Sequence, residues 1–174
     1  MKRQILIPCV AALGLAAGTS VKGAGPLASA QLNNTKGEVV GTVAIRDTPS
    51  SGVWLNVSIK NLPPGSHGFH IHETGKCDPD FKAAGGHFAP NGREHGVLVE
   101  GGKHAGDLPN IHVPKSGRLN VEIFARGVTL KEGEPNSLFD GDGSAIVIHA
   151  GPDDYKSQPS GAAGDRIACG VIQM

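Results

Sequence analysis

Short stretches in which apolar and polar residues alternate dominate this chain, and turns rich in glycine and proline separate them. Residues 53–60 are the clearest case, because Val53, Leu55, Val57 and Ile59 alternate there with a tryptophan and polar residues. Successive side chains of a strand point to opposite faces of a sheet, so this pattern predicts a half-buried strand. Similar runs predict strands at residues 39–46, 67–72, 118–130, 144–149 and 166–172.

Helical periodicity is absent from the sequence, since no segment carries a sustained apolar stripe at helical spacing. Several short strands with turn residues between them are typical of proteins in which two sheets pack face to face or one sheet closes on itself. The sequence therefore predicts an all-β sandwich or barrel. It contains no internal repeat and no candidate linker, which indicates one domain after the N-terminal segment.

Two stretches do not fit a succession of short strands. Residues 73–113 are glycine-rich and carry four of the seven candidate metal ligands described below, and residues 151–165 are polar and glycine-rich. Long loops are uncommon in compact domains and usually have a function. We therefore expect two functional loops.

The N-terminal segment has the features of a secretory signal peptide. Two basic residues follow Met1, an apolar run covers residues 5–17, and small and polar residues come next. This run is shorter than the about 20 residues needed to cross a bilayer. We predict a signal peptide over residues 1–30, with cleavage after Ser20, Gly23 or Ala30, and a mature domain over residues 31–174. Cys9 would be removed with the leader.

Two cysteines, Cys77 and Cys169, remain after the leader. An even number of cysteines in an exported protein favours a disulfide, and the chain has no CxxC spacing that would favour metal ligation instead. The sequence thus predicts one disulfide that closes a long loop, with a stabilisation of at most about 4–5 kcal/mol in the chain-entropy model.

The charge balance excludes some classes of partner. The chain contains 16 Lys and Arg and 16 Asp and Glu residues, so its formal net charge is zero. A neutral chain without a polybasic run is not typical of nucleic-acid-binding or membrane-surface proteins. We therefore expect no nucleic acid and, once the leader is removed, no membrane as partner.

The residues with the clearest chemistry are six histidines and one aspartate. Imidazole nitrogens bind copper and zinc well, and three imidazoles with one carboxylate suit a closed zinc site. These seven residues can satisfy two metal ions if one histidine is shared, which predicts a redox protein with two metals. They lie in four motifs: His70 and His72 in GFHIH, His87 and His95 in GGHFAPNGREHG, His104 and Asp107 in KHAGDLP, and His149 in AIVIHA.

Three of these histidines belong to predicted strands. The period of a strand places His70 and His72 on one face, while Phe69 and Ile71 point to the other. His149 stands at the end of another predicted strand. A cluster on rigid strands leaves a metal ion little freedom to adapt, and such an imposed geometry favours copper.

The other ligand candidates lie in the first long loop, with the spacing H-x7-H-x8-H-x2-D from His87 to Asp107. A loop that wraps a closed tetrahedral ion is typical of structural zinc. A shared imidazole must bind through both nitrogens, and His87 is the candidate by its position. His67 lies on the opposite face from His70, so we expect it to make a structural hydrogen bond. We expect His112 on the surface.

Together, GFHIH, GGHFAPNGREHG, KHAGDLP, AIVIHA and the terminal GDRIACGVI resemble the copper/zinc superoxide dismutases, especially their bacterial exported branch. The resemblance covers nearly everything after the leader. It implies a Greek-key β-sandwich, or flattened eight-stranded barrel, with two long functional loops. It also implies one copper and one zinc ion per subunit.

The resemblance assigns a role to each candidate residue. It implies that His87 also carries a proton to the product, that Arg166 is catalytic because it guides the anionic substrate, and that Asp153, rather than Asp154, links the two ligand sets from behind. It also pairs Cys77 with Cys169. The implied copper ligands are His70, His72, His87 and His149, and the implied zinc ligands are His87, His95, His104 and Asp107.

The activity that the resemblance implies is conversion of superoxide to dioxygen and hydrogen peroxide by Cu(II)/Cu(I) cycling. The implied duty is protection against superoxide outside the cytoplasm, with the periplasm as the expected location. The stretch from Cys77 to Gly86 is short for the bacterial branch, so the resemblance leaves open whether the chain forms a homodimer. A copper chaperone or copper-buffering domain on the same scaffold is the alternative, and it would not need an arginine that docks an anion.

Overall fold

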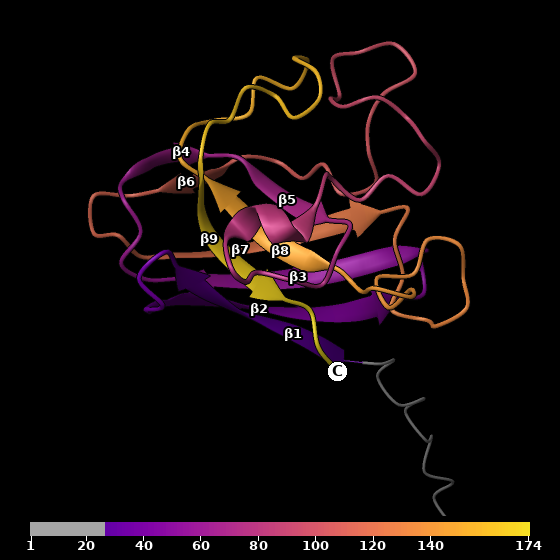
Figure 1. The fold of residues 1–174 in the computed structure, drawn as a ribbon, viewed down its shortest axis with the longest axis horizontal. Coiled ribbons are helices and arrows are strands. Elements are labelled where there is room, and N and C mark those ends of the chain that lie inside the picture. The colour runs from indigo at the N-terminus through magenta and orange to yellow at the C-terminus, as the bar shows by residue number, and fades with distance from the viewer. Residues whose placement is uncertain (1–26) are drawn as a thin grey trace, which may run out of the picture.

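The computed structural model describes residues 27–174 (Figure 1). The predicted signal peptide and Cys9 therefore lie outside the described residues, apart from positions 27–30 of the predicted leader. Nine strands and one short 3-10 helix make up the secondary structure of residues 27–174: β1 Leu27–Asn34, β2 Val39–Thr48, β3 Gly52–Ile59, β4 Gly65–His67, β5 Phe69–His72, η1 Phe81–Ala84, β6 Ile111–Val113, β7 Leu119–Arg126, β8 Ala145–His149 and β9 Arg166–Val171.

Seven of these strands form one curled antiparallel sheet with the order β5-β8-β9-β1-β2-β3-β7, and β4 pairs with β6 in a small second sheet (Figure 1). The predicted alternation in β3 is confirmed. Val53 and Leu55 are fully buried and face the core, whereas Trp54 and Asn56 on the opposite face are more exposed. The all-β prediction is thus confirmed, and the sheet curls into a half-barrel.

One predicted strand is divided in the structure. The run 67–72 falls into β4 and β5 on either side of Gly68. Gly68 donates from its N–H to Gly151 O and accepts from the His149 N–H, so the chain leaves β6 and joins β8 at this point. A Cβ atom added to Gly68 would lie 2.9 Å from the Ala163 side chain, which explains the glycine.

Two strands were missed in the sequence. β1 is rich in small and polar residues, which resemble the end of a leader, yet residues Leu27 to Ala30 pair in register with Arg46 to Val43 of β2. β6 lies at the end of the first predicted loop and has only three residues. In β1, the buried Ala28, Ala30 and Leu32 do alternate with polar residues, but this signal lies next to the apolar leader, whereas β6 is too short for a pattern to identify it.

Strands β5 and β8 have a different environment on each face. Phe69 and Ile71 face the main hydrophobic core, together with Ile146 and Ile148 of β8. On the other face, His70 lies opposite Val147 and His72 opposite Ala145, and these two β8 residues belong to a second, smaller cluster with Cys169. The histidine face is therefore closed by loops instead of a second sheet.

The first predicted loop follows β5 and the second follows β8, and the second loop and much of the first lie at the top of the view in Figure 1. The first contains η1, and the second connects β8 to β9. They contact one another, since the Leu98 N–H donates to Tyr155 O at 3.1 Å. Within residues 27–174, no helix is long and apolar enough to cross a membrane.

Candidate metal centre

The first ligand group joins two strands and one loop. His70 and His72 project from β5, His149 ends β8, and His87 comes from the first loop, where it bridges to His72. One ligand atom from each of these four residues lies within 4.8 Å of the others. The β8–β9 register shifts between Ile148 and His149, and such an irregularity changes the direction of a side chain at the end of a strand.

Hydrogen bonds fix the other nitrogen of each strand histidine. His72 Nδ1 donates to Gly85 O at 3.0 Å, and His149 Nδ1 donates to Gly164 O at 3.1 Å. His70 uses its opposite nitrogen, Nε2, which lies 2.8 Å from Asp153 Oδ2. These contacts set both the tautomer and the ring orientation, as supporting contacts do around metal ligands.

Four buried nitrogens then have no hydrogen-bond partner among the described residues: His70 Nδ1, His72 Nε2, His87 Nε2 and His149 Nε2. Buried polar atoms without partners are rare in native proteins and need an explanation. These four atoms converge on one point, and neutral imidazole is a good ligand for copper. The donor set and the burial of the group therefore fit a copper ion.

The second ligand group surrounds one carboxylate oxygen in the first loop. Asp107 Oδ1 lies 2.8 Å from His87 Nδ1, 2.9 Å from His95 Nδ1 and 3.2 Å from His104 Nδ1. The edge of a tetrahedron with metal–ligand bonds of about 2.0 Å is about 3.3 Å long, close to these separations. One carboxylate oxygen that gathers three imidazoles fits a closed zinc site better than three separate hydrogen bonds.

His87 is the residue common to both groups. Its Nδ1 lies in the second group and its Nε2 is the unpartnered nitrogen in the first. Asp153 makes a further link, because its two oxygens lie 2.8 Å from His70 Nε2 and 3.0 Å from His95 Nε2. The structure therefore places Asp153 between the two groups, where the resemblance located the linking carboxylate.

Burial and hydrogen bonding shift the pKa values toward the forms that bind metal. Burial lowers the pKa of His70 and of His149 to about 4, and it lowers the pKa of His72 well below its usual value. The pKa of His87 is also lowered, again mainly by burial. Burial by itself would raise the pKa of Asp107, but hydrogen bonds from His87 and the Gly96 N–H outweigh it and lower the value. Neutral imidazoles and ionised carboxylates at neutral pH are the states in which these groups act as ligands.

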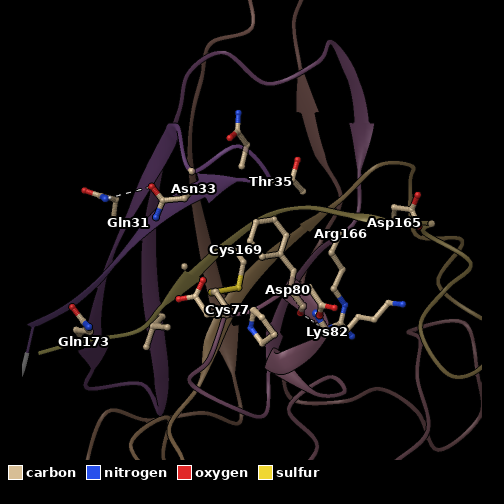
Figure 2. A pocket seen from close by; sticks show the side chains of 18 residues that line it. Gln31, Asn33, Thr35, Cys77, Asp80, Lys82, Asp165, Arg166, Cys169 and Gln173 are labelled. Carbon is tan, nitrogen blue, oxygen red and sulfur yellow. Dashed lines mark hydrogen bonds between the residues drawn. A yellow bond between two sulfur atoms is a disulfide. The ribbon is translucent and has the colours of Figure 1, made fainter.

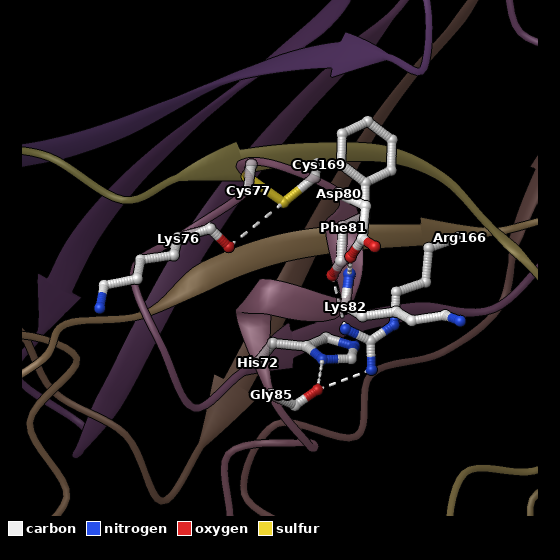
Figure 3. Close-up of a disulfide and its surroundings, with 9 residues drawn as sticks. All are labelled: His72, Lys76, Cys77, Asp80, Phe81, Lys82, Gly85, Arg166 and Cys169. Atoms are coloured by element: carbon white, nitrogen blue, oxygen red, sulfur yellow. Dashed lines mark hydrogen bonds between the residues drawn. A yellow bond between two sulfur atoms is a disulfide. The ribbon is translucent and has the colours of Figure 1, made fainter.

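Arg166 lies beside the first group on β9. Its guanidinium donates to Phe81 O and Gly85 O, both at 2.6 Å (Figure 3). Gly85 O also accepts from His72 Nδ1, so one carbonyl connects the arginine to a candidate copper ligand. The charge of Arg166 contributes to lowering the pKa of both His72 and His149.

The predicted disulfide between Cys77 and Cys169 is confirmed, with an S–S distance of 2.07 Å. It ties the first loop to β9 three residues beyond Arg166 (Figure 3). A groove of about 1130 Å³ runs beside it, and Arg166 and Lys82 are among the residues that line it (Figure 2). None of the seven candidate ligands belongs to this lining.

Two other histidines lie as expected. His67 is buried, and its ring nitrogens lie 2.8 Å from His149 O and 2.9 Å from Pro63 O. His112 is exposed. The sequence reasoning missed the carbonyl groups of Phe81, Gly85 and Gly164, because a backbone acceptor gives no signal in residue type.

Comparison with known proteins supports the same conclusion as this geometry. Residues 39–172 match the family model described as copper/zinc superoxide dismutase. The chain is 53% identical to superoxide dismutase [Cu-Zn] 2 of Aquifex aeolicus over 148 residues, which cover 84% of this chain and 86% of that one. It is 44% identical to the superoxide dismutase-like protein YojM of Bacillus subtilis, over 82% of this chain and 74% of that one.

Solved structures agree in fold. A crystal structure of a superoxide dismutase-like protein from Bacillus subtilis matches with a TM-score of 0.79 and 43% identity, over 82% of this chain and 96% of that chain. The Cu/Zn superoxide dismutase from Brucella abortus matches with a TM-score of 0.70 and 31% identity, over 85% and 100% of the two chains. Sequence, fold and ligand geometry agree, and the chain belongs to the copper/zinc superoxide dismutase family.

Proposed function

We propose that this protein is a superoxide dismutase that converts superoxide to dioxygen and hydrogen peroxide. Copper would be held by His70, His72, His87 and His149, and zinc by His87, His95, His104 and Asp107. The observation that carries the proposal is the convergence of four buried, unpartnered imidazole nitrogens next to a second histidine–aspartate group that shares one residue with them.

Copper would supply the change between Cu(II) and Cu(I) that accepts an electron from one superoxide and returns it to another. The protein would supply position and charge. His72 and His149 are oriented by carbonyl acceptors, and His70 by Asp153. Because these contacts fix both the tautomer and the direction of each ring, the ligand atoms are ready before an ion arrives.

Arg166 is the residue that we propose docks the anion. Its guanidinium is permanently charged, half-buried and fixed by two carbonyls, and its charge acts on His72 and His149. The two hydrogen bonds hold one edge of the guanidinium, which leaves other N–H groups free for superoxide. Since the net charge of the chain is zero, attraction must come from local groups such as this one.

His87 is the residue that we propose carries the proton for the product. Its Nε2 belongs to the first group, while its Nδ1 is held beside Asp107 in the second. A proton held at Nε2 would therefore lie where peroxide leaves, and the fixed Nδ1 side would keep the ring in place.

Superoxide consumption by the mature protein, after copper and zinc loading and with the metal content determined on the same sample, tests this function. We expect rapid, copper-dependent turnover with one copper and one zinc per chain. Both metals bound without turnover would contradict the enzyme proposal and favour a copper-buffering protein.

We also propose that the protein is exported to the periplasm. The basic and apolar start of the chain, the Cys77–Cys169 disulfide and the bacterial relatives support this location. Because Leu27 to Ala30 pair with β2, cleavage after Ser20 or Gly23 would leave β1 whole, whereas cleavage after Ala30 would remove half of it. We therefore expect cleavage before β1. The mass of the mature protein in a periplasmic extract gives its first residue, and a mature protein that begins at residue 31 would contradict cleavage before β1.

A homodimer is the assembly that we propose to test for the mature protein. Sedimentation of the metal-loaded protein over a range of concentrations measures it directly. A single species at the monomer mass at all concentrations would exclude the homodimer.

A further inference from the structure

Two amide side chains each make a pair of hydrogen bonds to the backbone of one residue of the metal centre. Gln158 Oε1 accepts from the His95 N–H at 3.0 Å, and Gln158 Nε2 donates to His95 O at 2.8 Å. Asn110 Oδ1 accepts from the Asp153 N–H, and Asn110 Nδ2 donates to Asp153 O, both at 2.9 Å. We call these two pairs the amide clamps.

The clamps run in opposite directions between the two long loops. Gln158 belongs to the second loop and holds His95 of the first, whereas Asn110 belongs to the first loop and holds Asp153 of the second. Each clamp satisfies both backbone groups of its target, as a partner strand would do in a sheet. These loop residues thus obtain the fixed backbone that β5 gives to His70 and His72.

Gln158 is exposed, so it does not fill the core. Ordering a glutamine side chain costs more conformational entropy than ordering most residues, and an exposed position gives no burial in return. The geometry that it fixes is demanding, because the buried His95 ring reaches Asp107 Oδ1 at 2.9 Å and Asp153 Oδ1 at 3.0 Å with its two nitrogens. The neighbouring Gly92 and Gly96 have φ values of +60° and +100°, so the local chain does not adopt an ordinary extended conformation.

We propose that Gln158 is a positioning residue for the zinc ligand His95, and that Asn110 is its counterpart for the carboxylate that holds the His95 ring. The inference rests on the proposed zinc site. Gln158 fixes the His95 backbone, and Asn110 fixes the backbone from which Asp153 reaches the ring. Together they set where the His95 Nδ1 lone pair points before zinc binds.

The two clamps should have different effects on the two metals. Gln158 contacts the zinc side alone, through His95. Asn110 acts through Asp153, which touches both His95 and His70, so it influences the copper side as well. A merely structural role would lower stability without separating zinc affinity from copper affinity.

The test is zinc and copper affinity, each measured by competition with a chelator on the full mature protein. In Gln158→Ala we expect zinc affinity to fall by about 10–100-fold, the usual effect of losing a supporting contact around a metal ligand, with copper affinity unchanged. Asn110→Ala should lower the affinity for both zinc and copper. Gln158→Glu keeps the acceptor for the His95 N–H but sets a carboxylate oxygen against His95 O, so its zinc affinity should also fall.

Gln173→Ala is the matched control, because Gln173 is exposed and its side chain makes no hydrogen bond within residues 27–174. Zinc affinity that is unchanged in Gln158→Ala, or that falls equally in Gln173→Ala, would overturn the inference. If Gln158→Ala does not fold, Gln158→Glu decides, and wild-type zinc affinity in that variant would overturn it. Failure of the wild-type protein to bind zinc would instead overturn the proposed zinc site.

Discussion

The two ligand groups of this protein differ in what holds their residues in place. His70 and His72 lie on β5, whose four residues pair in continuous register with β8. His95, His104 and Asp107 lie outside the strands, and side chains from the other long loop hold the first of them. A backbone in a buried ladder opens only with the sheet, whereas a loop opens locally at lower free energy. Three of the four residues on the copper side are therefore held by the sheet, whereas His87 and the zinc side lie on the first loop and depend on contacts between loops and on the ion itself.

Removal of one ligand from each group gives the largest expected difference. His149→Ala should reduce dismutation to the background rate, because the copper side loses a ligand that no neighbour can replace. His104→Ala should leave copper binding and part of the activity, while zinc affinity falls by more than the about 10–100-fold cost of losing a supporting contact. Steady-state activity and metal content of both variants measure this. Equal loss of activity in the two variants, with copper retained in each, would contradict the proposed difference between the copper side and the zinc side.

Acid should destabilise the metal-free protein through the buried histidines of the copper side. The pKa values of His70 and His149 are about 4, below their unfolded value of 6.5, so the folded metal-free protein binds fewer protons than the unfolded chain between pH 6.5 and 4. Stability is thus complete above pH 6.5 and falls as the pH decreases, by at most about 3 kcal/mol for each group at pH 4. Denaturant unfolding of the metal-free protein across this range measures it, and constant stability would contradict the pKa shifts.

The loaded protein should lose zinc before copper during the same titration. His70 and His149, two of the proposed copper ligands, stay unprotonated until the pH approaches 4, and the sheet holds them, whereas the proposed zinc ligands lie on a loop. Metal analysis after dialysis at successive pH values gives the order. Early loss of copper with zinc retained would contradict the comparison.

Removal of the disulfide should reduce activity less than removal of a ligand does, and its effect should be on the position of the first loop. Cys77→Ser combined with Cys169→Ser should lower the free energy of unfolding by about 2–4 kcal/mol. It should also lower activity at full metal loading, because the carbonyls that hold Arg166 belong to the loop that the disulfide ties to β9. Reversible unfolding and activity on one preparation test both parts. Lower stability with unchanged activity would show that the loop holds Arg166 without the disulfide.

Arg166→Ala should have a smaller effect in free energy than removal of a ligand or of the disulfide. Guidance of an anion by local charge changes association rates by about 10–10³-fold, and this enzyme family is a known case of such steering. We expect kcat/KM to fall by about 10–100-fold and its salt dependence to flatten, with both metals still bound. Arg166→Lys is the matched control, because it keeps the charge but cannot reach both Phe81 O and Gly85 O. Unchanged kinetics in Arg166→Ala would exclude the docking role.

The sequence predicts the copper side of this molecule better than the zinc side. The period of a strand places His70 and His72 on one face, and the structure agrees because the ladder with β8 enforces that period. The spacing of His95, His104 and Asp107 identifies the residues, but a loop has no period from which their geometry could be derived. The clamps made by Gln158 and Asn110 were not foreseen, since their targets are backbone atoms of distant residues.

The errors in the predicted fold have physical causes of the same kind. β1 was taken in part for the end of the leader, because its first residues are small and its pairing with β2 is a long-range property. The break between β4 and β5 depends on the close approach of Ala163 and Gly151 to Gly68, and both belong to the second loop. Local pattern identified most of the strands but not β1 and β6, and tertiary contacts determine where β1 and β5 begin.

Hydrogen exchange of the metal-free and the zinc-loaded protein is the most direct test of this comparison. It shows whether the sheet keeps the copper side in place without metal and whether the zinc side needs its ion. We predict that zinc removal increases exchange at the Gly96, Leu98 and Asp154 amides, whose hydrogen bonds join or support the two loops. It should leave protected the β8 amides and the β5 amides that face β8, but not that of Ile71, which donates to Gly106 O in the first loop. Equal loss of protection in β5 and β8 would contradict a copper side formed by the fold. Unchanged exchange in the loops would contradict a zinc side that depends on its ion.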